Sequence, residues 1–266
     1  MTPTTTPTRT LLLALTAAAA MAGCSDSTSP RMASVNFSFA GVRPSTGAAA
    51  LRLPGQPFVV PGPGDSLVIA VGTDSLIITK VEVVARKIEL KGSESTDCDD
   101  EGEMDDCDEL QLNARLFRLP LAEGVSSPIG VDVPAGTYEG IEIKIHKPTS
   151  SSGDAAFLAA NPEWPAGQSV RVTGFYRNVP FTYTSDVVFK VDQALVPPLT
   201  VVEGTATNVT IRIDVASWFR NASSGALIDP ATAGESGVNR NVVDQNIRNS
   251  VRAFRDDDED GDESDG

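Results

Sequence analysis

Hydrophobic and polar residues alternate along much of the chain. In residues 141–145 the order is Ile-Glu-Ile-Lys-Ile, and in residues 209–213 it is Val-Thr-Ile-Arg-Ile. Alternation with a period of two places the apolar side chains on one face of a β-strand and the polar ones on the other. We therefore predict strands that each bury one face.

Further segments are rich in Val, Ile, Thr and Phe and are separated by turn residues. The predicted strands are residues 33–39, 58–60, 66–71, 75–90, 110–119, 138–146, 169–178, 182–191 and 207–215. Many short strands with little helical periodicity favour an antiparallel β-sandwich over a parallel sheet. The sequence thus predicts an all-β protein, with one antiparallel β-sandwich domain over residues 33–232.

Two segments carry a helical pattern. Val243, Ile247, Val251 and Phe254 follow each other at helical spacing, and Ser236 is available as an N-cap, so we predict a C-terminal helix within residues 233–255. The helix either docks on the sandwich or binds a partner through its arginines. A shorter helical turn is expected at residues 155–160.

The N-terminus has the pattern of an export signal. Arg9 precedes an apolar run of signal-peptide length, and small residues lead to Cys24. The cleavage site resembles the lipobox of bacterial lipoproteins, in which the cysteine becomes the lipidated first residue of the mature chain. We therefore predict a signal peptide at residues 1–23, a tether at 24–32, and a protein held in the bacterial cell envelope through lipid on Cys24. The alternative is ordinary secretion with a free Cys24 thiol.

The charge distribution limits the classes of partner that this protein could bind. The net charge is −15, from 36 acidic and 21 basic residues. Residues 97–109 and 256–266 together hold 17 of the carboxylates and no Lys or Arg, which leaves 19 acidic residues against 21 basic ones elsewhere. Nucleic acids and anionic surfaces recruit basic patches, so this distribution argues against nucleic acid as a partner. It favours cations or solvation of both acidic tracts.

Cys98 and Cys107 are the two cysteines that lipidation would leave. Outside the cytoplasm an even pair favours a disulfide. The bridge would close a loop of about ten residues and stabilise the fold by roughly 2.5 to 3 kcal/mol. The alternative is two free thiols in the acidic loop at residues 93–109.

The acidic loop also matches part of a calcium-binding template. Gly102 falls at position six, and oxygen ligands fall at positions one, three, five, nine and twelve, namely Asp97, Asp99, Glu101, Asp105 and Asp108. Position twelve is Asp instead of the bidentate Glu, and strands are predicted on both sides. Two hypotheses follow: a disulfide-closed calcium site, or a solvated hairpin loop.

The C-terminal tract begins in the same way. Asp256, Asp258 and Asp260 are followed by Gly261, but the sequence stops at Gly266 before a twelfth ligand. Repulsion among adjacent carboxylates favours an extended chain. We predict a disordered acidic tail at residues 256–266.

No catalytic motif is found. His146 is the single histidine, at a predicted strand end, where a solvated side chain is expected. Gly234 and Ser236 match the first part of the nucleophile-elbow pattern Gly-x-Ser-x-Gly, but Val238 stands where the pattern needs its last glycine. The sequence therefore predicts no enzyme, but a binding or structural module whose partners are glycans or envelope proteins. The alternative function is a glycan-binding sandwich with Trp164 and Tyr176 as exposed stacking residues.

Three segments carry a resemblance to a known family. Residues 77–83, 133–141 and 202–207 are similar, in this order, to segments of an uncharacterised bacterial lipoprotein domain with a prealbumin-like sandwich. The resemblance covers roughly residues 73–230 and implies a fold and an envelope location, with no catalytic residues. Gly136, in the segment Pro-Ala-Gly-Thr-Tyr, is expected to adopt a backbone geometry that other residues resist.

Overall fold

The computed structural model describes residues 32–41, 66–92, 114–121, 125–126, 128–151, 153–258 and 261. Several predictions fall outside these residues: the signal peptide, lipidation at Cys24, the Cys98 to Cys107 disulfide, and the calcium ligands Asp97, Asp99, Glu101, Asp105 and Asp108. Within the described residues, no helix is long and apolar enough to cross a membrane.

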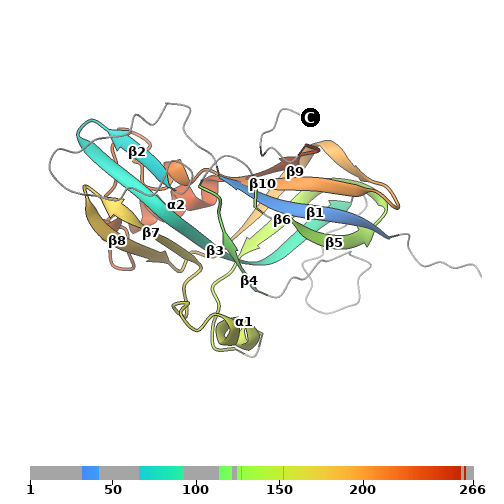
Figure 1. Cartoon of the computed structure of the whole chain (residues 1–266), viewed down its shortest axis with the longest axis horizontal. Coiled ribbons are helices and arrows are strands. Elements are labelled where there is room, and N and C mark those ends of the chain that lie inside the picture. Colours follow the sequence, from blue (N-terminus) through green and yellow to red (C-terminus); the bar gives the residue numbers. More distant parts are fainter. Residues whose placement is uncertain are drawn as a thin grey trace, which may run out of the picture. The chain divides into compact units, whose positions relative to one another are not determined.

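The described chain forms two β-sheets that pack as a sandwich (Figure 1). The smaller sheet has the strand order β11-β10-β1-β5, with bounds β1 (Met32–Gly41), β5 (Ile129–Pro134), β10 (Ala206–Ile213) and β11 (Val251–Arg255). In the larger sheet the order is β8-β7-β3-β6-β9, and β2 and β4 also pair with β3. Its strands are β2 (Leu67–Val71), β3 (Asp74–Gly92), β4 (Arg115–Arg118), β6 (Gly136–Ile145), β7 (Val170–Tyr176), β8 (Val179–Ser185) and β9 (Phe189–Val201).

The long strand β3 organises the larger sheet. Its first half pairs with β2 and β7, its middle with β4, and its second half with β6. Most strand pairs are antiparallel, as expected, but β1 and β10 are parallel neighbours in the smaller sheet. β1 and β10 are far apart in the sequence, so no hairpin turn connects them and forces an antiparallel pairing.

The core lies between the two sheets and follows the alternation in the sequence. Ile141, Ile143 and Ile145 on β6 are each at most 2% exposed. Val209 and Ile211 on β10 are fully buried in the same apolar cluster. Gln193 on β9 also joins the sheets, because its side-chain amide accepts from Ala253 N (3.0 Å) and donates to Ala253 O (2.9 Å) on β11.

Most predicted strands that fall on the described residues are confirmed within a few residues, with one division. The strand predicted at residues 58–60 lies outside the described residues, and β5 was not predicted. The predicted strand 182–191 is two strands, because the chain leaves β7 after Ser185 and joins β6 at Phe189. Ser169 secures the crossing, since its hydroxyl donates to Val187 O at 2.6 Å. The short helical turn is confirmed as α1 (Ala155–Ala160).

The predicted C-terminal helix is present but shorter than expected. α2 (Arg240–Asn249) begins after Asn239, not at a Ser236 cap, and ends at Asn249. Val251 and Phe254, predicted on the helix, belong to β11, which pairs with the edge of β10. The apolar stripe fits both structures, and the backbone hydrogen bonds offered by the open edge of β10 decide between them.

Two smaller expectations are wrong. Gly136 has no left-handed backbone angle, and a Cβ at this position would meet no atom within 4 Å. The tail predicted to be disordered from residue 256 begins with an ordered residue. Asp256 is fully buried, and its N–H donates to Asn208 O at 3.2 Å, which extends the β10 to β11 ladder by one bond.

Candidate functional site

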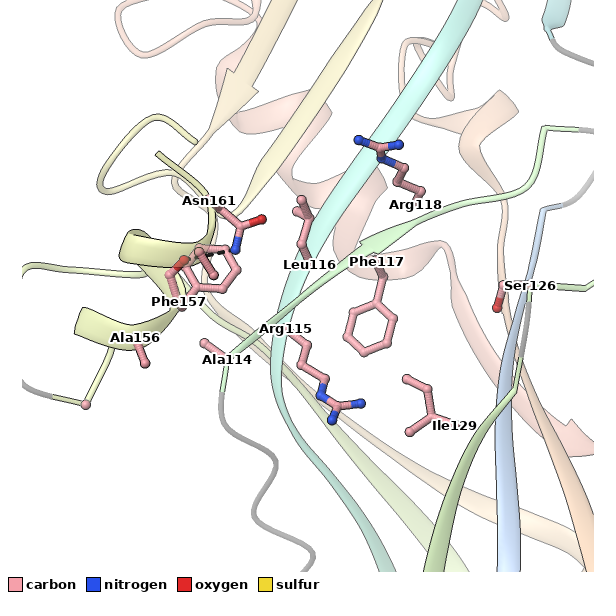
Figure 2. A pocket seen from close by; sticks show the side chains of 12 residues that line it. Ala114, Arg115, Leu116, Phe117, Arg118, Ser126, Ile129, Ala156, Phe157 and Asn161 are labelled. Carbon is pink, nitrogen blue, oxygen red and sulfur yellow. Dashed lines mark hydrogen bonds between the residues drawn. The ribbon is translucent and has the colours of Figure 1, made fainter. Parts of the chain in front are cut away.

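A surface hollow of about 820 Å³ lies between β4 and α1 (Figure 2). The residues that line it come from β4, the start of β5, α1 and their flanking segments. They are Ala114, Arg115, Leu116, Phe117, Arg118, Ser126, Ile129, Gly153, Ala156, Phe157, Ala160 and Asn161. The hollow therefore lies beside the larger sheet, where β4 pairs with β3 and α1 forms the opposite wall.

The lining combines apolar side chains with guanidinium groups. Figure 2 shows Arg115 and Phe117 directed from β4 toward Ile129, with Leu116 and Arg118 on the opposite side of the strand. Arg115 is exposed, and within the described part of the chain it forms no hydrogen bond or ion pair. A cationic group next to an apolar surface can receive an anion that also carries an apolar portion.

Arg118 is held by a buried carboxylate on β3. Glu82 is 0% exposed, and its oxygens accept from Arg171 Nε at 2.7 Å and Arg118 Nε at 3.3 Å, with Lys80 Nζ 3.3 Å away. Burial alone would raise the pKa of Glu82, but the hydrogen bond and charge of Arg171, with the charge of Lys80, hold that pKa below its usual range. Glu82 is thus an anion that ties β4 and β7 to β3.

Arg171 links this anion to the region of α1. Its guanidinium lies over the Trp164 ring, 4.8 Å from the centroid, and Trp164 packs edge-on against Phe157 of α1 at 6.4 Å. The Trp164 indole donates to Gln168 O at 2.8 Å, which satisfies its polar atom. One wall of the hollow therefore rests on a chain of contacts that runs from Glu82 through Arg171 and Trp164 to Phe157.

The aromatic residues named for glycan stacking do not form an exposed platform. Trp164 is 5% exposed and Tyr176 is 9% exposed. Trp164 lies in the loop between α1 and β7, and its ring packs in a second apolar cluster with Val84 and Phe157. Tyr176 is covered by Arg177, whose guanidinium lies 5.3 Å from the ring centroid. The prediction of exposed stacking surfaces at these two residues is wrong.

His146 and Asp154 fix the connection from β6 to α1. His146 Nε2 lies 2.9 Å and 3.0 Å from the two Asp154 carboxylate oxygens, and Thr149 N donates to Asp154 at 2.9 Å. The His146 side chain is 14% exposed, so it is not the solvated residue that we expected. No Ser, Thr or Cys side chain among the described residues hydrogen-bonds to His146. The pair therefore positions the start of α1.

This pair yields a prediction on the pH dependence of stability. Burial would raise the pKa of Asp154, but the Thr149 N–H and His146 outweigh it and lower that pKa below its usual 3.8. The stabilisation is present above pH 3.8 and is lost as the pH falls through the lowered pKa. We expect Asp154→Asn to reduce the free energy of unfolding by about 1 to 3 kcal/mol at pH 7. Urea unfolding from pH 7 to pH 3 measures the difference.

The expected signature is a difference between wild type and Asp154→Asn that shrinks toward pH 3. Asp132→Asn is the control, because Asp132 is exposed on β5. It should change stability by less than about 0.5 kcal/mol at every pH. If the difference in free energy of unfolding between wild type and Asp154→Asn stays constant with pH, the charge of the Asp154 carboxylate does not stabilise the fold.

Sequence reasoning missed the buried acids of the larger sheet. Glu142 on β6 is 3% exposed, although it occupies a polar position of the alternation, and Lys87, Lys91 and Lys190 surround its carboxylate. Glu89 on β3 is likewise 4% exposed and pairs with Lys87 at 2.9 Å. The alternation of Lys and Glu along residues 80–91 was the available signal, because a strand with such a face can pair charges across its neighbours.

The described residues contain no group of three or more His, Cys, Asp or Glu side chains arranged to hold a metal ion. Comparisons with known proteins are sparse. No family model matches the chain, so the resemblance to the lipoprotein domain rests on the segments quoted above. No curated protein matches it. Among solved structures it is similar to MbnP from Methylosinus trichosporium, with a TM-score of 0.44 and 11% identity over 84% of this chain and 99% of that one.

Proposed function

We propose that this protein is an exported, lipid-anchored binding module without catalytic activity, and that its ligand occupies the hollow between β4 and α1. The observation that carries the proposal is Arg115, an exposed guanidinium beside Phe117 and Ile129. An anion bound there would gain a charge-assisted hydrogen bond, and its apolar portion would leave water against the same wall.

Arg118 and Arg115 have different roles in this proposal. Arg118 already shares the Glu82 carboxylate, so much of its charge is compensated. Arg115 has no such partner among the described residues and supplies the charge that selects an acidic group. The proposed ligand class is accordingly a monovalent anion with an apolar body, such as a carboxylate with an alkyl or aryl chain.

Calorimetric titration of residues 25–266 with dodecanoate, below its micelle-forming concentration, tests this function. The segment contains every described strand and helix, which belong to one compact unit that begins at Arg31. We expect saturable binding that Arg115→Gln weakens about tenfold or more, because a hydrogen bond to a charged group contributes about 1.5 to 3 kcal/mol. Dodecyl maltoside, which has no charge and an alkyl chain about one carbon longer, should bind the wild type no more tightly than dodecanoate binds Arg115→Gln.

Lys144→Gln is the matched control, since it removes one exposed positive charge from β6 at a residue that does not line the hollow. It should bind dodecanoate as the wild type does. Equal affinity of Arg115→Gln and wild type, or the absence of saturable binding, would refute the proposed site.

The membrane anchor is a separate part of the proposal and rests on the N-terminal sequence. One acyl chain holds a protein marginally and two or more hold it stably, at about 0.8 kcal/mol for each buried methylene. We expect Cys24→Ser to move the protein from the membrane fraction to the soluble fraction and to abolish incorporation of labelled palmitate. Retention of Cys24→Ser in the membrane fraction would exclude lipid on Cys24 as the anchor.

A second proposed property is calcium binding in the acidic loop, which the spacing of Asp97, Asp99, Glu101, Asp105 and Asp108 favours. Calcium at one hundred times its dissociation constant would raise the free energy of unfolding by about 2.7 kcal/mol. We expect the midpoint of thermal unfolding to rise in calcium relative to chelator, and part of the rise to be lost when residues 99, 101 and 105 become Asn, Gln and Asn. An unchanged rise in this triple variant would leave the loop as solvated surface.

A further inference from the structure

β4 is an edge strand that runs along the hollow, between α1 and Ile129 (Figure 2). It pairs with β3 on one side, and no strand of the described residues pairs with its other side. An edge of this kind presents N–H and C=O groups with which a second extended chain can pair. All four residues of β4 also line the hollow, so the open edge and the hollow belong to one surface.

Two hydrogen bonds of Val84 on β3 show where the backbone groups of Leu116 on β4 point. Val84 N donates to Ser169 O at 2.8 Å, and Val84 O accepts from His146 N at 2.9 Å, so β4 uses neither group. Leu116 lies opposite Val84 in the pair of β3 and β4. In an antiparallel pair, the backbone groups of two opposite residues point either toward each other or both away. The N–H and C=O of Leu116 therefore point away from β3.

The same pattern continues at Arg118. Leu119 N donates to Val81 O at 3.0 Å, which makes these two residues a hydrogen-bonded pair. Because such pairs alternate along the strands, the preceding residue, Arg118, also directs its N–H and C=O away from β3. Among the described residues, no hydrogen bond reaches the backbone of Leu116 or Arg118 from this side. The edge thus offers a donor and an acceptor at two alternate residues, the spacing at which an antiparallel strand pairs.

Arg115 marks the end of the edge at which a negative charge fits. A chain antiparallel to β4 runs from Arg118 toward Arg115, so its C-terminus lies beside the Arg115 guanidinium. This side chain is exposed and forms no ion pair within the described part of the chain. Phe117 lies on the same side of β4 and faces Ile129 (Figure 2). Its ring packs on Phe39 with the centroids 4.4 Å apart, which fixes an apolar wall next to the charge.

We propose that the hollow binds the C-terminal segment of an extended peptide, which adds to β4 as an antiparallel strand. This inference rests on the proposed function, because it uses the same anion site and names the ligand class. The terminal carboxylate is the anion, and apolar side chains of the peptide are its apolar body. The hollow, at about 820 Å³, is within the usual size of ligand sites.

The pairing fixes which peptide positions are selected. The last peptide residue lies opposite Arg115, and the third from the end lies opposite Phe117. Side chains of opposite residues share one face of a sheet, so these two positions contact the wall of Phe117 and Ile129 and favour apolar residues. The second and fourth residues from the end exchange main-chain hydrogen bonds with Leu116 and Arg118. Main-chain bonds give such complexes their affinity, and alternate side chains give them their specificity.

Calorimetric titration of residues 25–266 with the peptide acetyl-Thr-Thr-Val-Thr-Leu, which ends in a free carboxylate, tests the added strand. We expect saturable binding. N-methylation of the second and fourth residues from the end should weaken it about tenfold or more, because their N–H groups donate to Leu116 O and Arg118 O. The matched control carries N-methyl groups on the last and third residues, whose N–H groups point away from β4. It should keep the affinity within about threefold.

The terminal charge is tested on the same peptide. Its C-terminal amide should bind the wild type about tenfold or more weakly than the acid does, because the charge-assisted bond to Arg115 is lost. Arg115→Gln should weaken binding of the acid by a similar factor and leave binding of the amide unchanged. Lys144→Gln, at an exposed residue that does not line the hollow, should bind both peptides as the wild type does.

The dodecanoate titration separates this inference from the proposed function. Strand addition is wrong, and the proposed function stands, if dodecanoate binds as expected but the peptide shows no saturable binding. The same holds if the two N-methylated peptides bind equally. If neither dodecanoate nor the peptide binds, both the function and the inference are wrong. Equal affinity of the acid and the amide for the wild type would overturn the placement of the carboxylate at Arg115.

Discussion

Gly174→Ala is expected to reduce the free energy of unfolding by about 3 kcal/mol or more. Gly174 lies on β7 opposite Ile78, where β3 has an irregularity between Ile78 and Lys80. A Cβ at this position would overlap the Ile77 carbonyl oxygen and lie 3.0 Å from the Ile77 carbonyl carbon and the Ile78 Cα. These are backbone atoms of the central strand, which cannot move away as a flexible side chain can. Thermal unfolding should show a midpoint lowered by roughly 6 to 12 °C.

Gly136→Ala on β6 provides the comparison. A Cβ at residue 136 would meet no atom within 4 Å, and the backbone there is not left-handed. The same chemical change should therefore be neutral or stabilise by up to about 1 kcal/mol, because alanine restricts the unfolded chain. Similar losses for both variants would mean that the close approach of β3 to Gly174 does not determine the effect.

Glu82→Gln is the second change with a large expected effect, a loss of about 3 kcal/mol at pH 7. The substitution keeps the shape of the side chain and removes the charge that Arg171 and Arg118 share. Arg171, with its side chain only 18% exposed, would be left without its anion. Removing one partner of a buried ion pair costs more than the pair contributes, since the other charge stays desolvated. Urea unfolding at pH 7 measures the loss.

The pH dependence tests the same assignment. Burial raises the pKa of Glu82, but the opposite effect of Arg171 and Lys80 is larger, so the pKa lies below its usual 4.5. The stabilisation is therefore present above pH 4.5 and is lost as the pH falls through the lowered pKa. The difference between wild type and Glu82→Gln should shrink toward pH 3. Glu139→Gln, at an exposed residue of β6, should have an effect below about 0.5 kcal/mol. A Glu82→Gln variant as stable as Glu139→Gln would show that the network does not stabilise the fold.

The local pattern predicted the parts of the fold that depend on nearest neighbours. Alternation identified β6 and β10 and the faces that they bury, since a period of two repeats within a few residues and needs no knowledge of partners. The same reasoning placed α1 at residues 155–160. It failed for residues 251–255, whose apolar spacing suits a helix as well as a strand until the edge of β10 is known to lie beside them.

The candidate sites depended on distant parts of the chain. Neither Arg115 nor Glu82 stands out in the sequence. Arg115 gains its importance from Ile129 and α1, and Glu82 from Arg171, which lies 89 residues further along the chain. The burial of Trp164 likewise depends on Phe157 and Val84, which meet only after the larger sheet has formed.

The sequence by itself determined the all-β character, most of the strands, the buried faces, the segregation of negative charge into two tracts and the carboxylate spacing of the calcium hypothesis. Only the tertiary structure decided which polar side chains are buried, that residues 251–255 form a strand of the smaller sheet, and which charge lies beside an apolar hollow. The physical reason is the separation along the chain between the residues that interact. Strand periodicity reflects interactions between residues that are near in sequence, whereas the desolvation of Glu82 or Asp256 depends on atoms that approach only through the pairing of distant strands.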